Sequence, residues 1–386
     1  MTERLYYQDC YLREFRAQVV ETSPDGLRVY LDRTAFYPTS GGQLFDIGSL
    51  GRANVTDVVD EAERVAHVVD APLRVGEIAG EIDWARRFDH MQQHSGQHLL
   101  SAVMEELFQI PTVSVHLGVE MSTIDLGAPA FTSAQVERAE ERCAEIVSEA
   151  RSVAITFDDA SADLGLRKAS ERTGTLRIVS IEGVDRSACG GTHVRTTAEI
   201  GPVLVRKLDK MRGNVRVEFV CGLRALRLAR ADFRAMQDIS RLVSVPAGET
   251  ASVVAAQMER LKAMEKTANR LAVELALREG KELWAATEPD ASGMRRLTVQ
   301  GPIDDAVRTR AQAFCSLGQA VFLAQSPDPP LLLLAASADS GLHAGERVKA
   351  AVTAAGGRGG GNQALAQGSL PAGADLDAIA RTLLLT

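Results

Sequence analysis

Hydrophobic periodicity changes abruptly early in this chain, and that change limits the folds that it can adopt. Residues 1–84 alternate apolar and polar positions in segments such as 53–60 and 64–70, which Gly, Pro and Asp clusters separate. This alternation predicts a β-rich, barrel-like domain. From Asp89 onward, apolar residues recur at helical spacing, which predicts a helix over 89–108 with Asp89 as its N-cap. We therefore expect an α+β fold.

The rest of the sequence predicts further domains, because 386 residues exceed the size at which one hydrophobic core usually stops growing. Two helices are expected at about 222–243 and 249–285. They are predicted to form an antiparallel hairpin, although the heptad-like apolar spacing of the second is also typical of a dimer-forming coil. The expected division is a β-rich domain at 1–84, an α+β domain at 85–222, a helical hairpin or linker at 223–287 and a small α/β domain at 288–386.

Composition excludes several classes of protein. The N-terminal segment lacks an apolar stretch of signal-peptide length, and the longest aliphatic run, Leu331–Leu334, is too short to cross a bilayer. Five scattered cysteines, an odd number, do not form the pattern of a disulfide framework. We therefore expect a cytoplasmic protein with reduced cysteines and no membrane partner.

Charge restricts how the chain could bind nucleic acid. The net charge of −8 gives no general attraction for it, so an RNA partner needs a local basic surface. Such a surface is predicted between Arg206 and Arg234, where nine Lys or Arg residues accompany three acidic ones. Arg212 and Arg216 are its candidate substrate-binding residues. The alternative is a solvated helix face and hairpin that bind nothing.

A stripe of histidines marks the predicted helix over 89–108. His90, His94 and His98 are four residues apart, so their side chains project from one face of the helix in successive turns. A His-x-x-x-His pair can hold one metal ion, because adjacent turns bring both rings to a common point. Histidines in ordinary packed or solvated helices are the alternative.

A second cluster, Cys189-Gly190-Gly191-Thr192-His193, follows a predicted strand. Its glycines allow a tight turn that brings a thiol and an imidazole to one centre. Nitrogen and sulfur ligands favour zinc over magnesium or calcium, which prefer oxygen. These residues alone leave open whether the site is a closed structural one or a catalytic one, and whether His193 binds the metal or lies beside it.

A third cluster lies near the start of the chain, over residues 31–44. Tyr37-Pro38 followed by Gly41-Gly42 is typical of a turn between strands, and composition alone favours that plain interpretation. The functional interpretation is that Gly41 and Gly42 let a substrate approach the backbone, while Thr34 and Gln43 present hydrogen-bonding groups to it.

In this order, the three clusters resemble the editing domain of alanyl-tRNA synthetases and its free-standing homologues, the AlaX trans-editing proteins. The resemblance covers the chain to about residue 240 and rests on DRTAFYP-TSGGQ, HSGQHLL and VDRSACGGTHV. Ser40 departs from it, since many relatives carry a third glycine there. The resemblance implies that Thr34 and Gln43 belong to the catalytic pocket, that His90 is not a ligand, and that Zn²⁺ is held by His94, His98, Cys189 and His193.

The same resemblance implies a zinc-dependent hydrolase that cleaves the ester between an amino acid and the 3′ end of tRNA. A pocket built for alanine rejects an added hydroxyl only by about a hundredfold, and it cannot exclude glycine by size. Ser-tRNA(Ala) is therefore the first expected substrate, with Thr34 as a candidate partner for the serine hydroxyl, and Gly-tRNA(Ala) is the second. The alternative from another class is a non-hydrolytic, zinc-stabilised module for tRNA binding or assembly.

The glycine-rich segment 355–368 resembles a motif of the C-terminal domain that alanyl-tRNA synthetases share with DHH-type phosphoesterases. No Gly-Lys-Ser/Thr follows it, so it is not a nucleotide P-loop, and we expect an ordered loop. In relatives this domain assists tRNA binding or self-association. A homodimer through the C-terminal region is therefore a further expectation.

Overall fold

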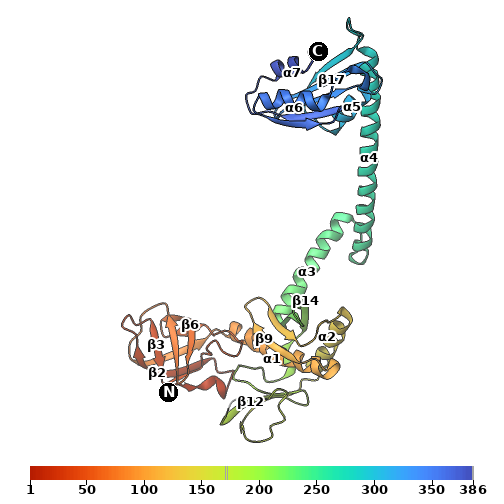
Figure 1. The fold of residues 1–386 in the computed structure, drawn as a ribbon. Coiled ribbons are helices and arrows are strands. Elements are labelled where there is room, and N and C mark those ends of the chain that lie inside the picture. Colours follow the sequence, from red (N-terminus) through yellow and green to blue (C-terminus); the bar gives the residue numbers. More distant parts are fainter. Residues whose placement is uncertain (170, 172, 385–386) are drawn as a thin grey trace. The chain divides into compact units, whose positions relative to one another are not determined.

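The computed structural model describes residues 1–169, 171 and 173–384. The chain divides into two compact units, Met1–Asp238 and Ile239–Thr386 (Figure 1). Helices and strands occur in both units, which confirms the mixed α+β class. The four-part division predicted from the sequence is finer than these two units and stays a prediction. No helix among the described residues is long and apolar enough to cross a membrane.

The N-terminal part of the first unit is a ring of six strands that closes into a barrel in the order β2-β3-β7-β6-β5-β8. Its β2 strand alternates buried and exposed residues, so that Phe15, Ala17 and Val19 point into the barrel core. A short parallel pair, β1 (Glu3–Arg4) with β4 (Arg33–Thr34), lies beside the ring. The six strands are β2 (Glu14–Thr22), β3 (Arg28–Leu31), β5 (Gly48–Leu50), β6 (Ala53–Glu61), β7 (Arg64–Val69) and β8 (Gly76–Ile82).

The helix that carries the histidines, α1 (Trp84–Phe108), begins five residues earlier than predicted. Its N-cap is Asp83, whose side chain accepts a hydrogen bond from the backbone N–H of Arg86. The prediction of Asp89 as the cap was wrong, because that carboxylate lies inside the helix and binds Arg224. The helix ends as predicted, with Gln109 in the left-handed conformation.

Around α1, the first unit adds two antiparallel sheets and the helix α2 (Ser133–Ser148). Every residue of α1 from His90 to Met104 is buried, because α2 and one sheet pack against it. That sheet has the order β14-β15-β10-β9, and the other has the order β11-β12-β13. The strands are β9 (Thr112–Leu117), β10 (Ser122–Leu126), β11 (Val153–Asp159), β12 (Thr175–Ile181), β13 (Asp185–Ala188), β14 (Val203–Met211) and β15 (Asn214–Cys221).

Two long helices follow, close to their predicted bounds: α3 (Gly222–Val243), which starts in the first unit, and α4 (Thr250–Ala286) of the second. The second unit then forms one sheet in the order β16-β17-β18-β20-β19. The expected glycine-rich loop was wrong in one respect, because Arg358–Gly361 forms the edge strand β19, whose backbone pairs with β20. The other elements are α5 (Asp305–Cys315), α6 (Ala344–Ala354), α7 (Leu376–Leu384), β16 (Arg295–Gln300), β17 (Ala320–Pro327), β18 (Pro330–Ala336) and β20 (Leu365–Ser369).

A buried ion pair joins the barrel to α1. The guanidinium of Arg87 contacts both carboxylate oxygens of Asp46, at 2.5–3.1 Å, and neither side chain is exposed. Arg87 also donates to the carbonyls of Cys10 and Ala35, at 2.8 and 2.6 Å, while Asp46 accepts from the N–H of Tyr37 at 2.6 Å. Because each charge is paired and further hydrogen-bonded, the desolvation cost of burial is offset.

Removing one partner of this pair should destabilise the first unit strongly. We expect Asp46→Ala to lower the free energy of unfolding by about 3–5 kcal/mol, because it leaves the Arg87 charge buried without its counter-ion. The measurement is urea unfolding of the full chain carrying Trp284→Phe, so that Trp84 alone reports on the first unit. The matched control is Glu77→Ala, which breaks an exposed pair with Arg16 and should cost less than about 1 kcal/mol. Equal losses in both variants would contradict the structural role of Asp46.

Candidate metal centre and its cavity

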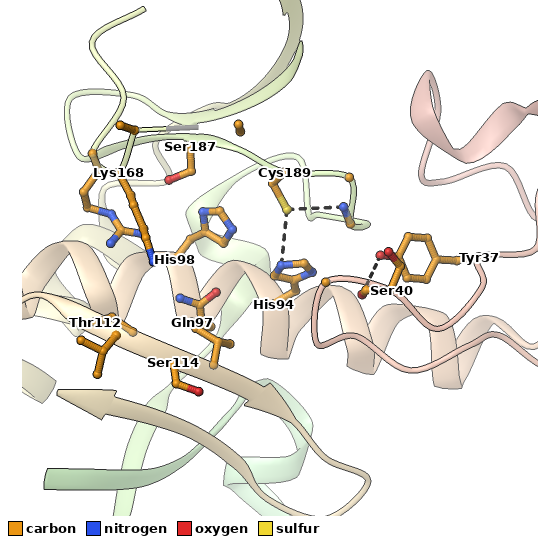
Figure 2. A pocket seen from close by; sticks show the side chains of 18 of the residues that line it. Tyr37, Ser40, His94, Gln97, His98, Thr112, Ser114, Lys168, Ser187 and Cys189 are labelled. Carbon is orange, nitrogen blue, oxygen red and sulfur yellow. Dashed lines mark hydrogen bonds between the residues drawn. The ribbon is translucent and has the colours of Figure 1, made fainter. Parts of the chain in front are cut away.

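Four side chains from two distant segments meet at one point. His94 and His98 project from successive turns of α1, and the loop after β13 brings Cys189 toward them (Figure 2). The same loop adds His193 to the group. Their candidate ligand atoms all lie within 4.8 Å of one another, and all four residues are at least partly buried. The structure therefore brings together the four residues that the sequence predicted, and His90 is not among them.

Each of the three histidines is held by a hydrogen bond at its Nδ1 atom. The Nδ1–H of His94 donates to Gln43 Oε1 at 2.8 Å, and that of His98 donates to Asp185 Oδ2 at 2.7 Å. His193 Nδ1 lies 3.0 Å from the Oγ of Ser95. These contacts leave the Nε2 atoms as the ligand atoms, which is the arrangement that usually orients metal-binding histidines.

The donor set fits zinc. Cys189 Sγ lies 3.4 Å from the Nε2 of His94 and 3.3 Å from the Nε2 of His193. Burial opposes ionisation of this thiol, but its interactions with His94 and His193 hold the pKa of Cys189 well below its ordinary value. A thiolate among imidazole nitrogens is a ligand set typical of zinc.

Burial and neighbouring charges also determine the protonation of His193, His98 and Asp185. Burial lowers the pKa of His193 to about 3, so its ring is neutral and its Nε2 lone pair is free. Burial would also lower the pKa of His98, but the Asp185 carboxylate and Cys189 raise it to about 9. Burial would raise the pKa of Asp185, yet His98 and Arg167 bring it down to about 2. Asp185 is therefore a carboxylate that favours proton retention at His98 Nδ1, the atom that faces away from the cluster.

Gln43 reaches the cluster from a tight turn. Ser40 and Gln43 exchange backbone hydrogen bonds, and the two residues between them, Gly41 and Gly42, have φ values of +55° and +85°. Those angles define a type I′ turn, whose positive φ positions are both occupied by glycine, so serine fits at position 40. Beyond its bond to His94, Gln43 donates to Thr192 Oγ1 and accepts from the Thr192 N–H, at 2.8 and 3.1 Å.

A cavity of about 450 Å³ opens beside the cluster. His94, His98 and Cys189 border it, whereas His193 is not part of its wall. A metal held by this set would therefore face the cavity. The rest of the wall is mostly polar and includes Tyr7, Ser40, Gly41, Gln97, Thr112, Ser114, Arg167, Lys168 and Ser187 (Figure 2).

Comparison with known proteins identifies the family. Residues 176–218 match the family described as Threonyl and Alanyl tRNA synthetase second additional domain. Alanyl-tRNA editing protein Aarsd1-B of Xenopus laevis is 32% identical over 291 residues, which cover 70% of this chain and 71% of that protein. This chain belongs to the alanyl-tRNA editing protein family.

Two archaeal members of this family are similar over a shorter part of the chain. Alanyl-tRNA editing protein AlaX-L of Pyrococcus horikoshii is 35% identical over 244 residues, covering 58% of this chain and 59% of that protein. Alanyl-tRNA editing protein AlaX-M of Methanosarcina mazei is 36% identical over 243 residues, covering 57% of this chain and 96% of that protein. The similarity to the second protein therefore extends over nearly all of that protein but over little more than half of this chain.

Thr34 and Gln43, the predicted catalytic residues of this editing-family protein, do not border the cavity. Thr34 is fully buried in the barrel, where its Oγ1 lies 2.8 Å from His67 Nε2 and accepts from the N–H of Phe36 at 3.1 Å. Since His67 Nδ1 contacts the carbonyl of Val29, its Nε2 accepts the Thr34 proton. The hydroxyl of Thr34 is therefore already engaged as both donor and acceptor.

Of the four predicted substrate-binding residues, one borders the cavity and three do not. Gly41 borders the cavity, and a Cβ atom built on it would meet no other atom within 4 Å. Gly42 packs near Val115 and is not part of the wall. Arg212 is exposed in the turn between β14 and β15, and Arg216 is bound to Asp125 at 2.7 and 2.9 Å. Neither arginine borders the cavity.

Among the residues of the site that sequence reasoning missed are Ser95, Lys168 and Asp185. Asp185 lies four residues before Cys189 at the start of β13, and an acidic residue so close to a predicted ligand was a usable signal. Ser95, next to His94, and Lys168, in an irregular segment, carried none, because only the tertiary fold brings them to the cluster and cavity.

Gly191 offers a sharp test of the loop that carries Cys189. A Cβ atom on Gly191 would lie 2.1 Å from Cε1 of His94, whereas one on Gly190 would have no neighbour closer than 3.6 Å. We expect Gly191→Ala to displace His94 and to reduce zinc retained after dialysis against a chelator, while Gly190→Ala retains it. The measurement is metal content per chain, with thermal unfolding recorded alongside. Full zinc retention in Gly191→Ala would show that His94 is not confined as described.

Asp185 offers a second test, because it orients His98 without lining the cavity. We expect Asp185→Asn to lower zinc affinity about 10- to 100-fold, the usual effect of removing a carboxylate that orients a metal-binding histidine. Competition with a coloured chelator measures this affinity. Asp159→Asn, an exposed change at the end of β11, is the control and should leave it unchanged. Identical affinities in the two variants would contradict the assigned role of Asp185.

Proposed function

We propose that this protein is a trans-editing deacylase that hydrolyses the ester of mischarged tRNA(Ala), with Ser-tRNA(Ala) as first substrate and Gly-tRNA(Ala) as second. The observation that carries the proposal is the position of the donor cluster, since His94, His98 and Cys189 form part of the wall of an open cavity. A purely structural zinc site has no need of such an opening. Relatives that are named alanyl-tRNA editing proteins support the same conclusion.

The residues of the cluster would hold Zn²⁺, with Gln43, Asp185 and Ser95 fixing the three rings through Nδ1. Bound zinc supplies Lewis acidity, which polarises a carbonyl oxygen or lowers the pKa of water to about 7. The chain itself supplies position: its rings are locked before substrate arrives, so little reorganisation is needed during the reaction. No other general base is required by this arrangement.

Thr34 and Gln43 are proposed to act as positioning residues from behind the cavity wall. Gln43 links His94 to Thr192 of the facing loop, so it sets the distance between the two halves of the cluster. Thr34 fixes the segment that leads to Tyr37, and Tyr37 borders the cavity. Selection of serine over alanine is then assigned to the polar wall, where alanine would leave a hydrogen-bonding group unpaired.

tRNA is the proposed macromolecular partner. The basic segment between Arg206 and Arg234 supports this, and Arg212 is a better candidate for phosphate contact than Arg216, because Arg216 is bound to Asp125. A homodimer through the C-terminal region remains a proposal. It is supported by apolar side chains of α4 that are more than half exposed: Met258, Leu261, Met264, Leu271 and Leu275.

The decisive experiment is deacylation by the purified full-length protein. We expect it to release serine from Ser-tRNA(Ala) and to leave Ala-tRNA(Ala) intact, while Cys189→Ala is at least a hundredfold slower, which is roughly the loss caused by removing one group that stabilises a transition state. Acid precipitation of labelled aminoacyl-tRNA over time measures both rates. Inert wild-type protein would reject the proposal.

The alternative, a non-hydrolytic zinc-stabilised tRNA-binding module, makes a different prediction for metal removal. If zinc only stabilised the fold, the chelator-treated protein would unfold at a lower temperature and bind tRNA less tightly, and the loaded protein would show no turnover. The proposed deacylase should instead lose turnover on chelation while retaining its circular dichroism spectrum, and regain turnover when zinc is added back.

A further inference from the structure

One wall of the cavity carries a cation that the proposed mechanism does not use. Lys168 borders the cavity from the segment between β11 and β12, and its side chain appears on the same side as His98 in Figure 2. Within the described part of the chain, no salt bridge or hydrogen bond engages its ammonium group. An unpaired cation at a cavity that faces a metal site favours an anionic ligand.

The other charged groups of the wall are already neutralised. Asp60 is bound by the guanidinium of Arg4 through two hydrogen bonds, of 2.8 and 2.7 Å. Arg167 donates to the buried Asp185 at 2.6 Å. Among the described residues of this wall, and leaving aside the candidate metal ligands, Lys168 is therefore the charged residue without a partner of opposite charge.

We propose that Lys168 binds the phosphodiester of the 3′-terminal nucleotide and so places the acyl ester at the candidate metal centre. This inference rests on the proposed function and deepens it. An amino acid esterified to tRNA has no free carboxylate, and its amino group is cationic, so a lysine cannot bind the acyl part through charge. The anions nearest to the ester are the backbone phosphates, and the first of them belongs to the same nucleotide.

The position of Lys168 in the fold makes it suitable for this role. Its neighbour Arg167 is anchored by Asp185, and the same carboxylate holds His98. The backbone at Lys168 is therefore tied to the metal cluster through two hydrogen-bonded side chains. A phosphate bound at Lys168 would be placed relative to His98 by contacts within the protein, which is how remote binding groups orient a reacting centre.

The test compares a ligand that has the phosphate with one that lacks it. Binding is measured with a non-hydrolysable amide-linked seryl-tRNA(Ala), and turnover with Ser-tRNA(Ala) and with seryl-adenosine, which has no phosphate. We expect Lys168→Gln to weaken seryl-tRNA binding and to raise its KM about tenfold with kcat nearly unchanged, since it removes one charge-assisted contact. Turnover of seryl-adenosine should not change. The slope of log affinity against log salt concentration should become shallower by the amount expected for the loss of one phosphate contact.

Two further variants make the comparison specific. Lys168→Arg should restore most of the lost affinity, because it keeps the charge. Lys349→Gln, at an exposed lysine on α6 of the second unit, is the matched control and should leave KM and the salt dependence unchanged. Normal binding of seryl-tRNA by Lys168→Gln would overturn the inference, and so would an equal loss on seryl-tRNA and seryl-adenosine.

The outcomes also separate this inference from the proposed function. Wild-type protein that binds the amide-linked seryl-tRNA through Lys168 but hydrolyses neither ester would reject the deacylase and retain the phosphate contact. Wild-type protein that hydrolyses both esters, with Lys168→Gln indistinguishable from it, would retain the deacylase and reject the contact. Wild-type protein that does not bind seryl-tRNA at all would overturn both.

Discussion

The buried Arg87–Asp46 ion pair is the constraint on which the site depends. It fixes the loop before β5 against the first turn of α1. Asp46, the residue of this loop that forms the pair, lies only three residues after Gln43. Gln43 can therefore reach both His94 on the helix and Thr192 on the facing loop. Without this fixed contact between barrel and helix, the two-glycine turn alone would not determine the direction of the Gln43 side chain. The barrel thus helps to position the candidate ligands without contributing one of them.

The opposite side of the cluster depends on close approach rather than charge. Gly191 lies so near His94 that any side chain would overlap its ring, so the loop holding Cys189 can close fully on α1. His193, from the same loop, contacts Ser95, which is the residue after His94. Helix α1 and the loop that carries Cys189 and His193 therefore hold each other in place. The low exposure of α1 from His90 to Met104 shields these hydrogen bonds from water and strengthens them.

The sequence predicted features that depend on local spacing and ligand chemistry. The helical i, i+4 pair of His94 and His98, and the Cys-x-x-x-His loop, indicated a metal site, and the family resemblance completed the set of four residues that the structure brings together. Helix positions were also predicted to within a few residues where apolar periodicity was continuous, as in α3 and α4. The start of α1 was missed, because Asp83 and Asp89 are equally good caps by residue type and only the packed structure gives Asp89 to Arg224.

What the sequence could not predict is which polar groups remain free after folding. Thr34 and Arg216 were chosen for what their side chains can bind, but His67 and Asp125 already occupy them. Lys168 attracted no attention in the sequence, yet the fold leaves its charge without a partner at the cavity. Partner choice depends on contacts between residues far apart in the chain, and Asp185 is the clearest case. One carboxylate binds both His98 and Arg167, so the orientation of a candidate metal ligand and the position of the neighbouring lysine have a common anchor.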